Sequence, residues 1–176
     1  MAPVIRPGTL ADVPAMAGIY GEAVRTMTVT FETEPPGDAE MARRFAAREA
    51  GGHPCLVAEI DGDVAGYAET RPYHHRAGYR FTAEDSIFLA PEARGHGIGT
   101  ALLTALVAEA EARGFRQLIA VIGDADNAGS IALHRKVGFE LVGTTRAVGV
   151  KFGRWIDVVI MQRALGEGAT TLPPGV

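Results

Sequence analysis

Residues 85–109 read D-S-I-F-L-A-P-E-A-R-G-H-G-I-G-T-A-L-L-T-A-L-V-A-E, and this stretch decides the fold. The apolar run at 87–89 predicts a buried strand, which Pro91 ends because proline has no N–H to donate. The glycine-rich segment 94–99 then opens a helix, whose apolar residues recur at helical spacing (Leu102, Leu103, Leu106 and Val107). Free N–H groups and the helix dipole make such a helix start suitable for binding phosphate.

The glycine pattern distinguishes between known phosphate-binding loops. A P-loop needs a lysine after its last glycine, but Thr100 follows Gly99 directly, and the dinucleotide-binding fingerprint needs a glycine where Thr100 stands. The pattern that fits is R-x-x-G-x-G, formed by Arg94, Gly97 and Gly99. It resembles the pyrophosphate-binding loop of the GNAT N-acetyltransferases. For this motif alone, a glycine-rich helix start without a ligand is the alternative interpretation.

Length and composition describe a single globular domain. The chain has 176 residues, of which 47% are hydrophobic, and its net charge of −4 without a basic run makes nucleic acid an unexpected partner. No apolar run is long enough to cross a bilayer and the N-terminus does not read as a secretion signal, so we expect no membrane partner and a cytoplasmic location. Cys55 is the only cysteine, which excludes an internal disulfide and a cysteine-based zinc site. We expect one domain over residues 1–165 and a disordered tail over 166–176, which is rich in Gly, Thr and Pro.

Hydrophobic periodicity predicts the element order β-α-α-β-β-β-α-β-α-β-β. The expected strands cover residues 4–6, 55–60, 64–70, 82–89, 117–122, 139–145 and 155–162. Asp61-Gly62 predicts a tight hairpin turn, and Gly114 and Gly138 predict the ends of two helices. This order predicts an α/β (α+β) fold, with a central sheet and helices on both of its faces.

A second motif agrees with the first. Asn127-x-x-Ser130-x-x-x-His134-x-x-x-Gly138-Phe139 is similar to the second cofactor motif of the GNAT superfamily, in which an asparagine opens a helix and Gly-Phe closes it. With both motifs and the matching element order, the chain is identified as a member of that superfamily. Membership implies the GNAT fold, a mixed and mostly antiparallel sheet flanked by helices.

The resemblance narrows to the phosphinothricin and methionine sulfoximine acetyltransferases, and it spans roughly residues 4–165. The segments that carry it are residues 84–89, 121–123, 133–134 and 149–157, of which K-F-G-R-W-I-D favours the methionine sulfoximine or sulfone branch. It implies acetyl-CoA as co-substrate, no metal, direct transfer to the α-amino group of a small amino acid analogue, and a homodimer. At His134 the chain departs from the pattern of the wider superfamily. Many relatives outside this branch have a tyrosine at this position, which is proposed as the general acid.

Acetyl transfer from a thioester to an amine requires a base, a donor to the carbonyl oxygen and a proton for the leaving thiolate. Glu84 is the candidate base, and a surface carboxylate is the alternative interpretation. The resemblance implies that a backbone N–H at Phe88 or Leu89 polarises the carbonyl. His134 is either a proton donor or acceptor, or a histidine that packs beside the cofactor. The cofactor-binding residues that the resemblance implies are Ile87, Phe88, Leu89, Arg94, Gly95, His96, Gly97, Ile98, Gly99, Thr100, Asn127 and Ser130.

An anionic amino acid analogue favours arginine as its partner, because the guanidinium bonds bidentately to carboxylates. The resemblance places the triplet Tyr79-Arg80-Phe81 against the substrate, which makes Arg80 the leading candidate, whereas Arg71 and Arg76 read as solvated surface charges. The expected substrate-binding residues are Phe31, Glu32, Tyr79, Arg80, Phe81, Lys151 and Arg154. No metal site is expected, because the adjacent His74 and His75 point in different directions and lack a third ligand at useful spacing.

Two rival functions remain open at this point. Within the superfamily, the chain could acetylate a protein N-terminus or a polyamine, and an acidic groove would favour such cationic substrates. From a different class, it could be a non-catalytic acyl-CoA-binding module, which would need the glycine loop but not Glu84.

Overall fold

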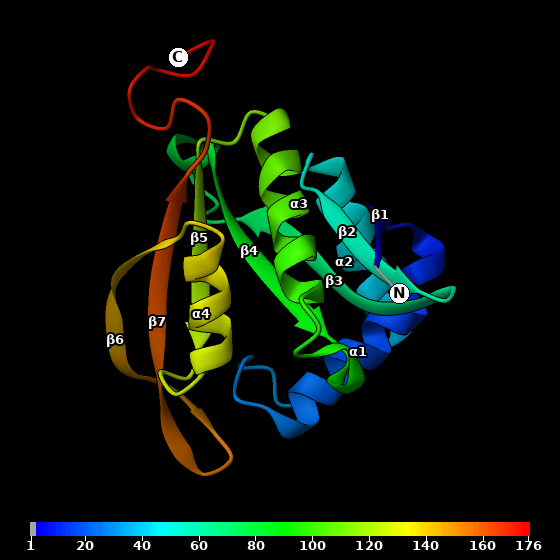
Figure 1. Ribbon diagram of the computed structural model, residues 1–176. Coiled ribbons are helices and arrows are strands. Elements are labelled where there is room, and N and C mark those ends of the chain that lie inside the picture. Colours follow the sequence, from blue (N-terminus) through cyan, green and yellow to red (C-terminus); the bar gives the residue numbers. More distant parts are fainter. Residues whose placement is uncertain (1–2) are drawn as a thin grey trace.

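The computed structural model describes residues 3–176, so Met1 and Ala2 of the expected 1–165 domain lie outside the described residues. Its helices and strands follow the predicted order (Figure 1). They are β1 (Val4–Pro7), α1 (Val13–Thr26), α2 (Asp38–Ala50), β2 (Cys55–Ile60), β3 (Asp63–Pro72), β4 (Thr82–Leu89), α3 (Ile98–Ala112), β5 (Gln117–Gly123), α4 (Ala128–Lys136), β6 (Glu140–Lys151) and β7 (Arg154–Ala164).

The strands form one sheet in the order β1-β2-β3-β4-β5-β7-β6, in which all neighbours are antiparallel except β4 and β5. Among the described residues, β4 and β5 pair only over residues 82–85 and 117–120. Beyond these residues the two strands diverge, as Figure 1 shows. The sheet is therefore open in its middle, and we call this opening the β4–β5 gap.

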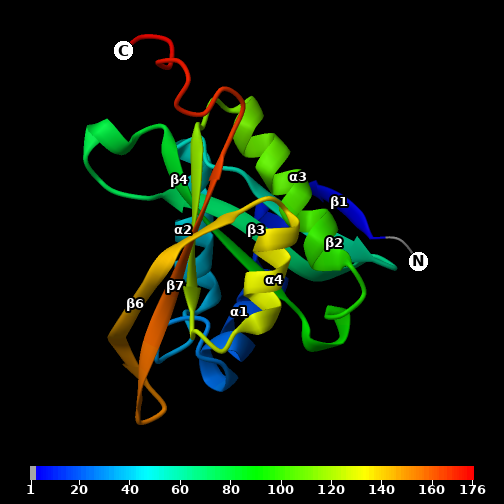
Figure 2. The same ribbon diagram turned by 60° about the vertical axis from the view of Figure 1, so that its left-hand side comes forward.

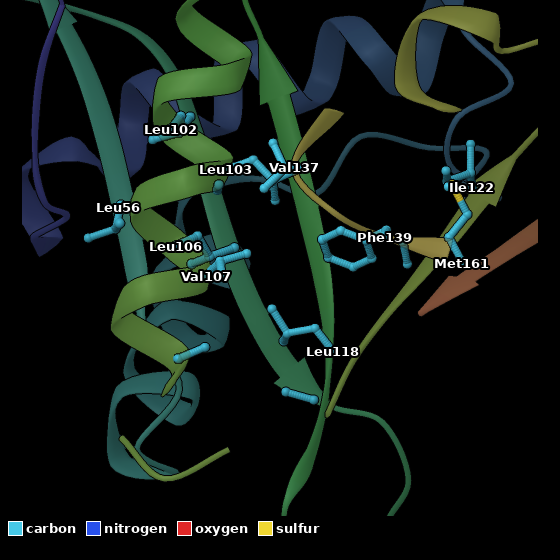
Figure 3. Packing of buried hydrophobic residues seen from close by; sticks show 14 of the residues in the cluster. Leu56, Leu102, Leu103, Leu106, Val107, Leu118, Ile122, Val137, Phe139 and Met161 are labelled. Atoms are coloured by element: carbon cyan, nitrogen blue, oxygen red, sulfur yellow. The ribbon is translucent and has the colours of Figure 1, made fainter. Parts of the chain in front are cut away.

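Helices cover both faces of the sheet (Figures 1 and 2). The apolar residues of α1 and α2 pack on one face, against Tyr67 of β3. On the other face, the leucines of α3 pack with Leu118 of β5 and Phe139 (Figure 3). Leu133 and Val137 attach α4 to this second core. The fold prediction of a mixed sheet between helices is confirmed.

Strand β4 contributes to both cores, because successive side chains of a strand point to opposite faces. Phe88 packs with the cluster under α1 and α2, whereas Ile87 and Leu89 pack with the cluster under α3. By the same alternation, Glu84 projects towards the α1–α2 face and Asp85 towards the α3–α4 face. Two cores thus hold the strand that carries Glu84, Ile87, Phe88 and Leu89.

The turns follow the predicted chemistry. Asp61 and Gly62 have φ values of 53° and 92°, as the two-residue turn of a hairpin requires. Gly114 and Gly138, with φ values of 86° and 88°, lie just beyond the ends of α3 and α4, where a left-handed residue ends a helix. These predictions are confirmed.

The last hairpin differs from the prediction. The predicted strands 139–145 and 155–162 leave residues 146–154 as their connection, but β6 runs to Lys151 and the turn consists of Phe152 and Gly153, with φ values of 51° and 72°. The pairing of β6 is irregular in its middle, where Ala147 has a φ of 51°. This irregularity breaks the alternation on which a strand prediction depends. The resulting hairpin extends well beyond the end of β5 (Figure 1).

Residues 166–176 form no helix or strand. Arg116 donates a hydrogen bond to the carbonyl oxygen of Thr171 at 3.0 Å and pairs with Glu167 at 3.3 Å. Disorder of this tail stays a prediction.

An ion pair between Arg6 and Asp12 connects β1 to the turn before α1. The carboxylate of Asp12 accepts two hydrogen bonds from the guanidinium of Arg6, at 2.8 and 2.9 Å, and one from the N–H of Thr9 at 2.8 Å. The hydrogen bonds from Arg6 outweigh burial and lower the pKa of Asp12 from 3.8 to about 2. Because the folded pKa is below the unfolded one, this stabilisation is present above pH 3.8 and is lost as the pH falls towards 2.

We expect Asp12→Asn to lower the free energy of unfolding by about 1–2 kcal/mol at neutral pH. The difference from the wild type should shrink below about pH 4, where the carboxylate of the unfolded wild type is already protonated. Urea denaturation of both proteins at neutral and acidic pH measures this difference in the free energy of unfolding. A difference that stays constant from neutral pH into the acidic range would contradict this account of Asp12.

Candidate active site

A cavity of about 480 Å³ lies at the β4–β5 gap. Its walls come from the C-terminal halves of β4 and β5, the glycine-rich segment before α3, and α4, and the end of α1 also lines it. Unpaired strand edges and a helix start therefore meet in one cavity.

The glycine-rich segment has the backbone of an anion-binding turn. Gly95 and Gly97 have φ values of 79° and 80°, and Gly97 directly precedes α3, in a conformation that favours glycine. A Cβ atom at Gly99 would approach the side chains of Leu133 and Leu89 to 3.3 Å, so this glycine permits the close packing of α3 beside the cavity. The first N–H groups of α3 have no partner within the helix and, together with its dipole, suit a pyrophosphate.

The other residues of this segment divide into two groups. Arg94 and Thr100 line the cavity, and the guanidinium of Arg94 donates a hydrogen bond to the carbonyl oxygen of Leu89 at 3.1 Å. In contrast, His96 is exposed and does not line the cavity, and Ile98 is buried in the core under α3. The side chains of these two expected cofactor residues therefore do not line the cavity.

The backbone edge of β4 is available to a ligand at the β4–β5 gap. Ala90 donates its N–H to Ala65 of β3 at 2.9 Å, and in an antiparallel pair the backbone groups of successive residues point in alternate directions. The N–H groups of Ile87 and Leu89 therefore point away from β3 and towards the gap, whereas that of Phe88 points to β3. Of the two expected carbonyl donors, Leu89 has the suitable orientation.

The start of α4 forms the opposite wall of the cavity. The side-chain oxygen of Asn127 accepts a hydrogen bond from the N–H of Ser130 at 3.2 Å, and both residues line the cavity. Asn127 thus begins the helix, as predicted. Its amide NH₂ group is left to donate to a ligand.

His134 and Asp85 form a buried pair in the wall of the cavity. The Nε2 atom of His134 lies 2.9 Å from Oδ2 of Asp85, and Nδ1 lies 2.8 Å from the carbonyl oxygen of Ser130. Only 3% of the His134 side chain and 1% of the Asp85 side chain are exposed. Burial alone would lower the pKa of His134, but the hydrogen bond and charge of Asp85, with the Ser130 carbonyl, raise it above 6.5.

Glu84 lies one residue before the part of β4 that lines the cavity. Its carboxylate accepts a hydrogen bond from the guanidinium of Arg71 on β3, and 12% of its side chain is exposed. The side chain of Arg71 is 60% exposed. A carboxylate and a guanidinium group thus lie together on the α1–α2 face, opposite the pair of His134 and Asp85.

Three of the expected substrate residues are close together near the end of the β6–β7 hairpin. The Nζ atom of Lys151 donates to the carbonyl oxygen of Thr30 at 2.8 Å, and the ring of Phe31 lies against Gly149, where a Cβ atom would clash with it. Glu32 follows and accepts hydrogen bonds from Tyr20 at 2.9 Å and from Arg44 at 2.6 Å. None of the three lines the β4–β5 cavity.

The remaining expected substrate residues lie elsewhere. Arg154 pairs with Asp124. Tyr79 and Arg80 line a second cavity of about 310 Å³, and the guanidinium of Arg80 lies 4.6 Å from the centre of the Phe81 ring. These residues belong to the loop that contains the short 3₁₀ turn Ala77–Tyr79, and they do not line the main cavity. In the single chain, the structure therefore does not bring Arg80 to the main cavity.

Sequence reasoning missed two residues of this site. Asp85 is assigned no role from the sequence, although a carboxylate inside a buried strand needs a partner, and this is the signal that could have found it. Arg71 was read as a solvated charge, yet the pairing of β3 with β4 places it opposite Glu84.

The described part of the chain provides no good cysteine nucleophile, no cluster of metal ligands and no membrane-spanning helix. Burial raises the pKa of the Cys55 thiol to about 12, so this residue is a poor nucleophile. Over residues 3–176, no cluster of three His, Cys, Asp or Glu side chains could hold a metal ion. No helix in this range is long and apolar enough to cross a membrane.

Comparisons with known proteins agree with the geometry. Residues 18–139 match the model of the acetyltransferase (GNAT) family. The chain is 51% identical to a phosphinothricin N-acetyltransferase of Alcaligenes faecalis, over 92% of this chain and 82% of the relative. It is 40% identical to an L-methionine sulfoximine/L-methionine sulfone acetyltransferase of Pseudomonas paraeruginosa, over 92% and 94% of the two chains.

A solved structure extends the match to three dimensions. The GNAT superfamily phosphinothricin acetyltransferase from Sinorhizobium meliloti, in complex with AcCoA, superposes with a TM-score of 0.96 at 50% identity, covering 100% of this chain and 96% of that one. The R-x-x-G-x-G turn, the β4–β5 gap and the second motif on α4 thus occur in a chain whose whole fold is shared with that enzyme. The chain belongs to the acetyltransferase (GNAT) family.

Proposed function

We propose that the protein transfers the acetyl group of acetyl-CoA to the α-amino group of a small amino acid analogue of the phosphinothricin or methionine sulfoximine type. The observation that carries this proposal is the cavity at the β4–β5 gap, which has a helix start suited to phosphate and the pair of Asp85 and His134 in its wall. Relatives that are 51% and 40% identical act on these two classes of substrate. The use of acetyl-CoA favours the cytoplasm as the place of action.

The residues present fit acetyl-CoA. The N–H groups at the start of α3 and the guanidinium of Arg94 suit its pyrophosphate, while the free N–H groups of β4 and the amide of Asn127 suit an extended arm that contains amide groups. When bound, this co-substrate supplies an activated thioester. The N–H of Leu89, fixed in the sheet, is the donor that we assign to the carbonyl oxygen.

We assign the removal of the amine proton and the binding of the substrate carboxylate to side chains on the α1–α2 face of the sheet. Glu84 takes the proton that the attacking amine releases, and Arg71 beside it pairs with the carboxylate of the amino acid substrate. His134, on the opposite face, lies in the cavity wall on the side of the cofactor.

A thiol-release assay with acetyl-CoA tests this proposal. Phosphinothricin, methionine sulfoximine and methionine sulfone are compared with spermidine and a short peptide that has a free N-terminus. We expect turnover with the first three amines only. Turnover confined to spermidine or the peptide would show the rival acetyltransferase function, and binding of acetyl-CoA without turnover of any amine would support a non-catalytic module.

We further propose that two copies of the chain associate through the β6–β7 hairpin. Large apolar side chains are exposed along it, among them Phe152 at 58% and Trp155 at 67%, and apolar patches of this kind mark interaction surfaces. β6 is also an edge strand of the sheet. The substrate residues near this hairpin would then lie at the interface between the two copies.

We expect Trp155→Glu to convert a dimer into a monomer, because it places a charge in the apolar interface. Size-exclusion chromatography with light scattering measures the mass of the variant and of the wild type. Leu172→Glu, at an apolar residue of the tail that is 77% exposed, is the matched control and should leave the mass unchanged. A wild type that elutes as a monomer, or a Trp155→Glu dimer, would overturn this proposal.

A further inference from the structure

The pair of Asp85 and His134 has a hydrogen-bonding pattern that determines where its protons lie. Nδ1 of His134 lies 2.8 Å from the carbonyl oxygen of Ser130 and 3.3 Å from the hydroxyl of the same residue. Because the nearer partner is a carbonyl, which can only accept, Nδ1 carries a proton. Nε2 faces Oδ2 of Asp85 at 2.9 Å. A second proton must lie between these two atoms, either on the imidazole beside a carboxylate or on the carboxyl group. The pair therefore stores one proton more than a neutral histidine beside a carboxylate.

The pair belongs to the cavity rather than to the core. Both residues line the cavity at the β4–β5 gap. Oδ1 of Asp85 is buried and has no hydrogen-bond partner among residues 3–176. A buried carboxylate oxygen needs a donor, and a ligand or water in the adjoining cavity can supply one.

The surroundings of the ring leave Asp85 as its charged partner. Phe139 places its edge against His134, with ring centres 5.0 Å apart. Arg135 and Lys136, on the same helix, are exposed, and Lys136 lines the cavity, as does Arg94. Arg163 of β7 donates to the carbonyl oxygen of Val137. The side chains that α3 contributes to the core beside α4 are apolar and carry no charge.

We propose that Asp85 is a positioning residue that holds His134 in its doubly protonated form, so that the pair delivers a proton to the thiolate leaving from acetyl-CoA. The inference rests on the proposed function. The amine nitrogen forms a bond to the carbonyl carbon and gives up one proton to Glu84. The carbon–sulfur bond breaks and leaves its two electrons on sulfur. The proton shared by His134 and Asp85 then passes to sulfur to give the thiol. Glu84 releases its proton to solvent and the pair takes one back, so the enzyme returns to its starting state.

Asp85→Asn is the decisive variant, because it keeps the shape of the side chain and removes the charge. Its amide NH₂ group can donate to Nε2, which fits a neutral imidazole whose Nδ1–H still bonds to Ser130. We expect kcat at neutral pH to fall about 10²-fold, the scale of general acid catalysis, while KM for acetyl-CoA changes by less than about threefold. The remaining rate should decline with rising pH below the ordinary pKa of histidine, about 6.5, because burial without the Asp85 charge lowers the pKa of His134, whereas the wild type keeps its rate to higher pH.

Nuclear magnetic resonance of the ¹⁵N-labelled protein without substrates tests the pair independently of turnover. We expect both ring nitrogens of His134 to carry protons at neutral pH in the wild type and only Nδ1 in Asp85→Asn. Asp12→Asn also removes a buried carboxylate but lies outside the cavity, so its pH–rate profile and its His134 signals should match the wild type. A wild-type His134 with one ring proton, or an Asp85→Asn enzyme with unchanged kcat or pH profile, would overturn the inference. If the wild type acetylates no amine, the proposed function fails, and the His134 signals alone then decide whether Asp85 holds the second proton.

Discussion

Glu84→Gln is expected to lower kcat about 10²- to 10⁴-fold, the range over which general acid–base groups contribute. Glutamine keeps the size of the side chain and can still accept the hydrogen bond from Arg71, but it cannot take up the proton of the attacking amine. The loss should fall on kcat, since Glu84 lies on the α1–α2 face and does not line the cavity that suits acetyl-CoA. Steady-state thiol release gives kcat, and calorimetry gives the dissociation constant for acetyl-CoA.

The matched control is Glu59→Gln, which also removes a carboxylate that pairs with an arginine, here Arg6 at 2.8 Å. Glu59 lies on β2, away from the cavity, so its variant should retain the wild-type kcat. Equal rates for Glu84→Gln and the wild type would remove Glu84 from the mechanism while leaving the fold and the family unaffected.

Gly97→Val is expected to raise the dissociation constant for acetyl-CoA about 10- to 100-fold. Gly97 has a φ of 80°, where a β-branched residue is strained by roughly 1–3 kcal/mol, and each 1.4 kcal/mol is about tenfold in affinity. No atom lies within 4 Å of a Cβ built at this position, so the cost arises from the backbone and not from a clash. The turn can relax only by abandoning the conformation that directs its N–H groups to a ligand.

Gly62→Val separates this effect from a general loss of stability. Gly62 has a φ of 92° in the turn between β2 and β3, again with no atom within 4 Å of an added Cβ. Its variant should melt at a lower temperature and bind acetyl-CoA like the wild type. Wild-type affinity in Gly97→Val would exclude this turn from the cofactor site.

Local features made much of the fold predictable. The turn at Asp61-Gly62, the helix ends at Gly114 and Gly138 and the helix start at Asn127 each depend on a few adjacent residues, and all four occur as expected. The element order followed from hydrophobic periodicity for the same reason. The extent of β6 was predicted less well, because a residue with positive φ, Ala147, interrupts its pattern.

The features of the site that could not be predicted depend on contacts between residues that are distant in the sequence. Asp85 and His134 are 49 positions apart, and their pairing depends on how α4 lies on the sheet. Arg80 has the chemistry of an anion-binding residue, but it follows a 3₁₀ turn and lines a second cavity. The sequence predicts Lys151 to bind the substrate, but its side chain is buried and donates to the carbonyl oxygen of Thr30. In each case the sequence shows the type of residue, but it does not show which residues surround that side chain in the folded chain.

The divergence of β4 and β5 creates two edge strands in the interior of a protein. Edge strands invite pairing with any extended chain, and proteins normally shield them or keep them short. Here α4 and the glycine-rich segment line the space between the two edges, so only a slender partner can enter. An arm with amide groups that enters lengthwise can hydrogen-bond as a missing strand would, in the manner of β-augmentation. In this fold, the interruption of the sheet is thus itself a means of selecting a ligand by its backbone-like shape.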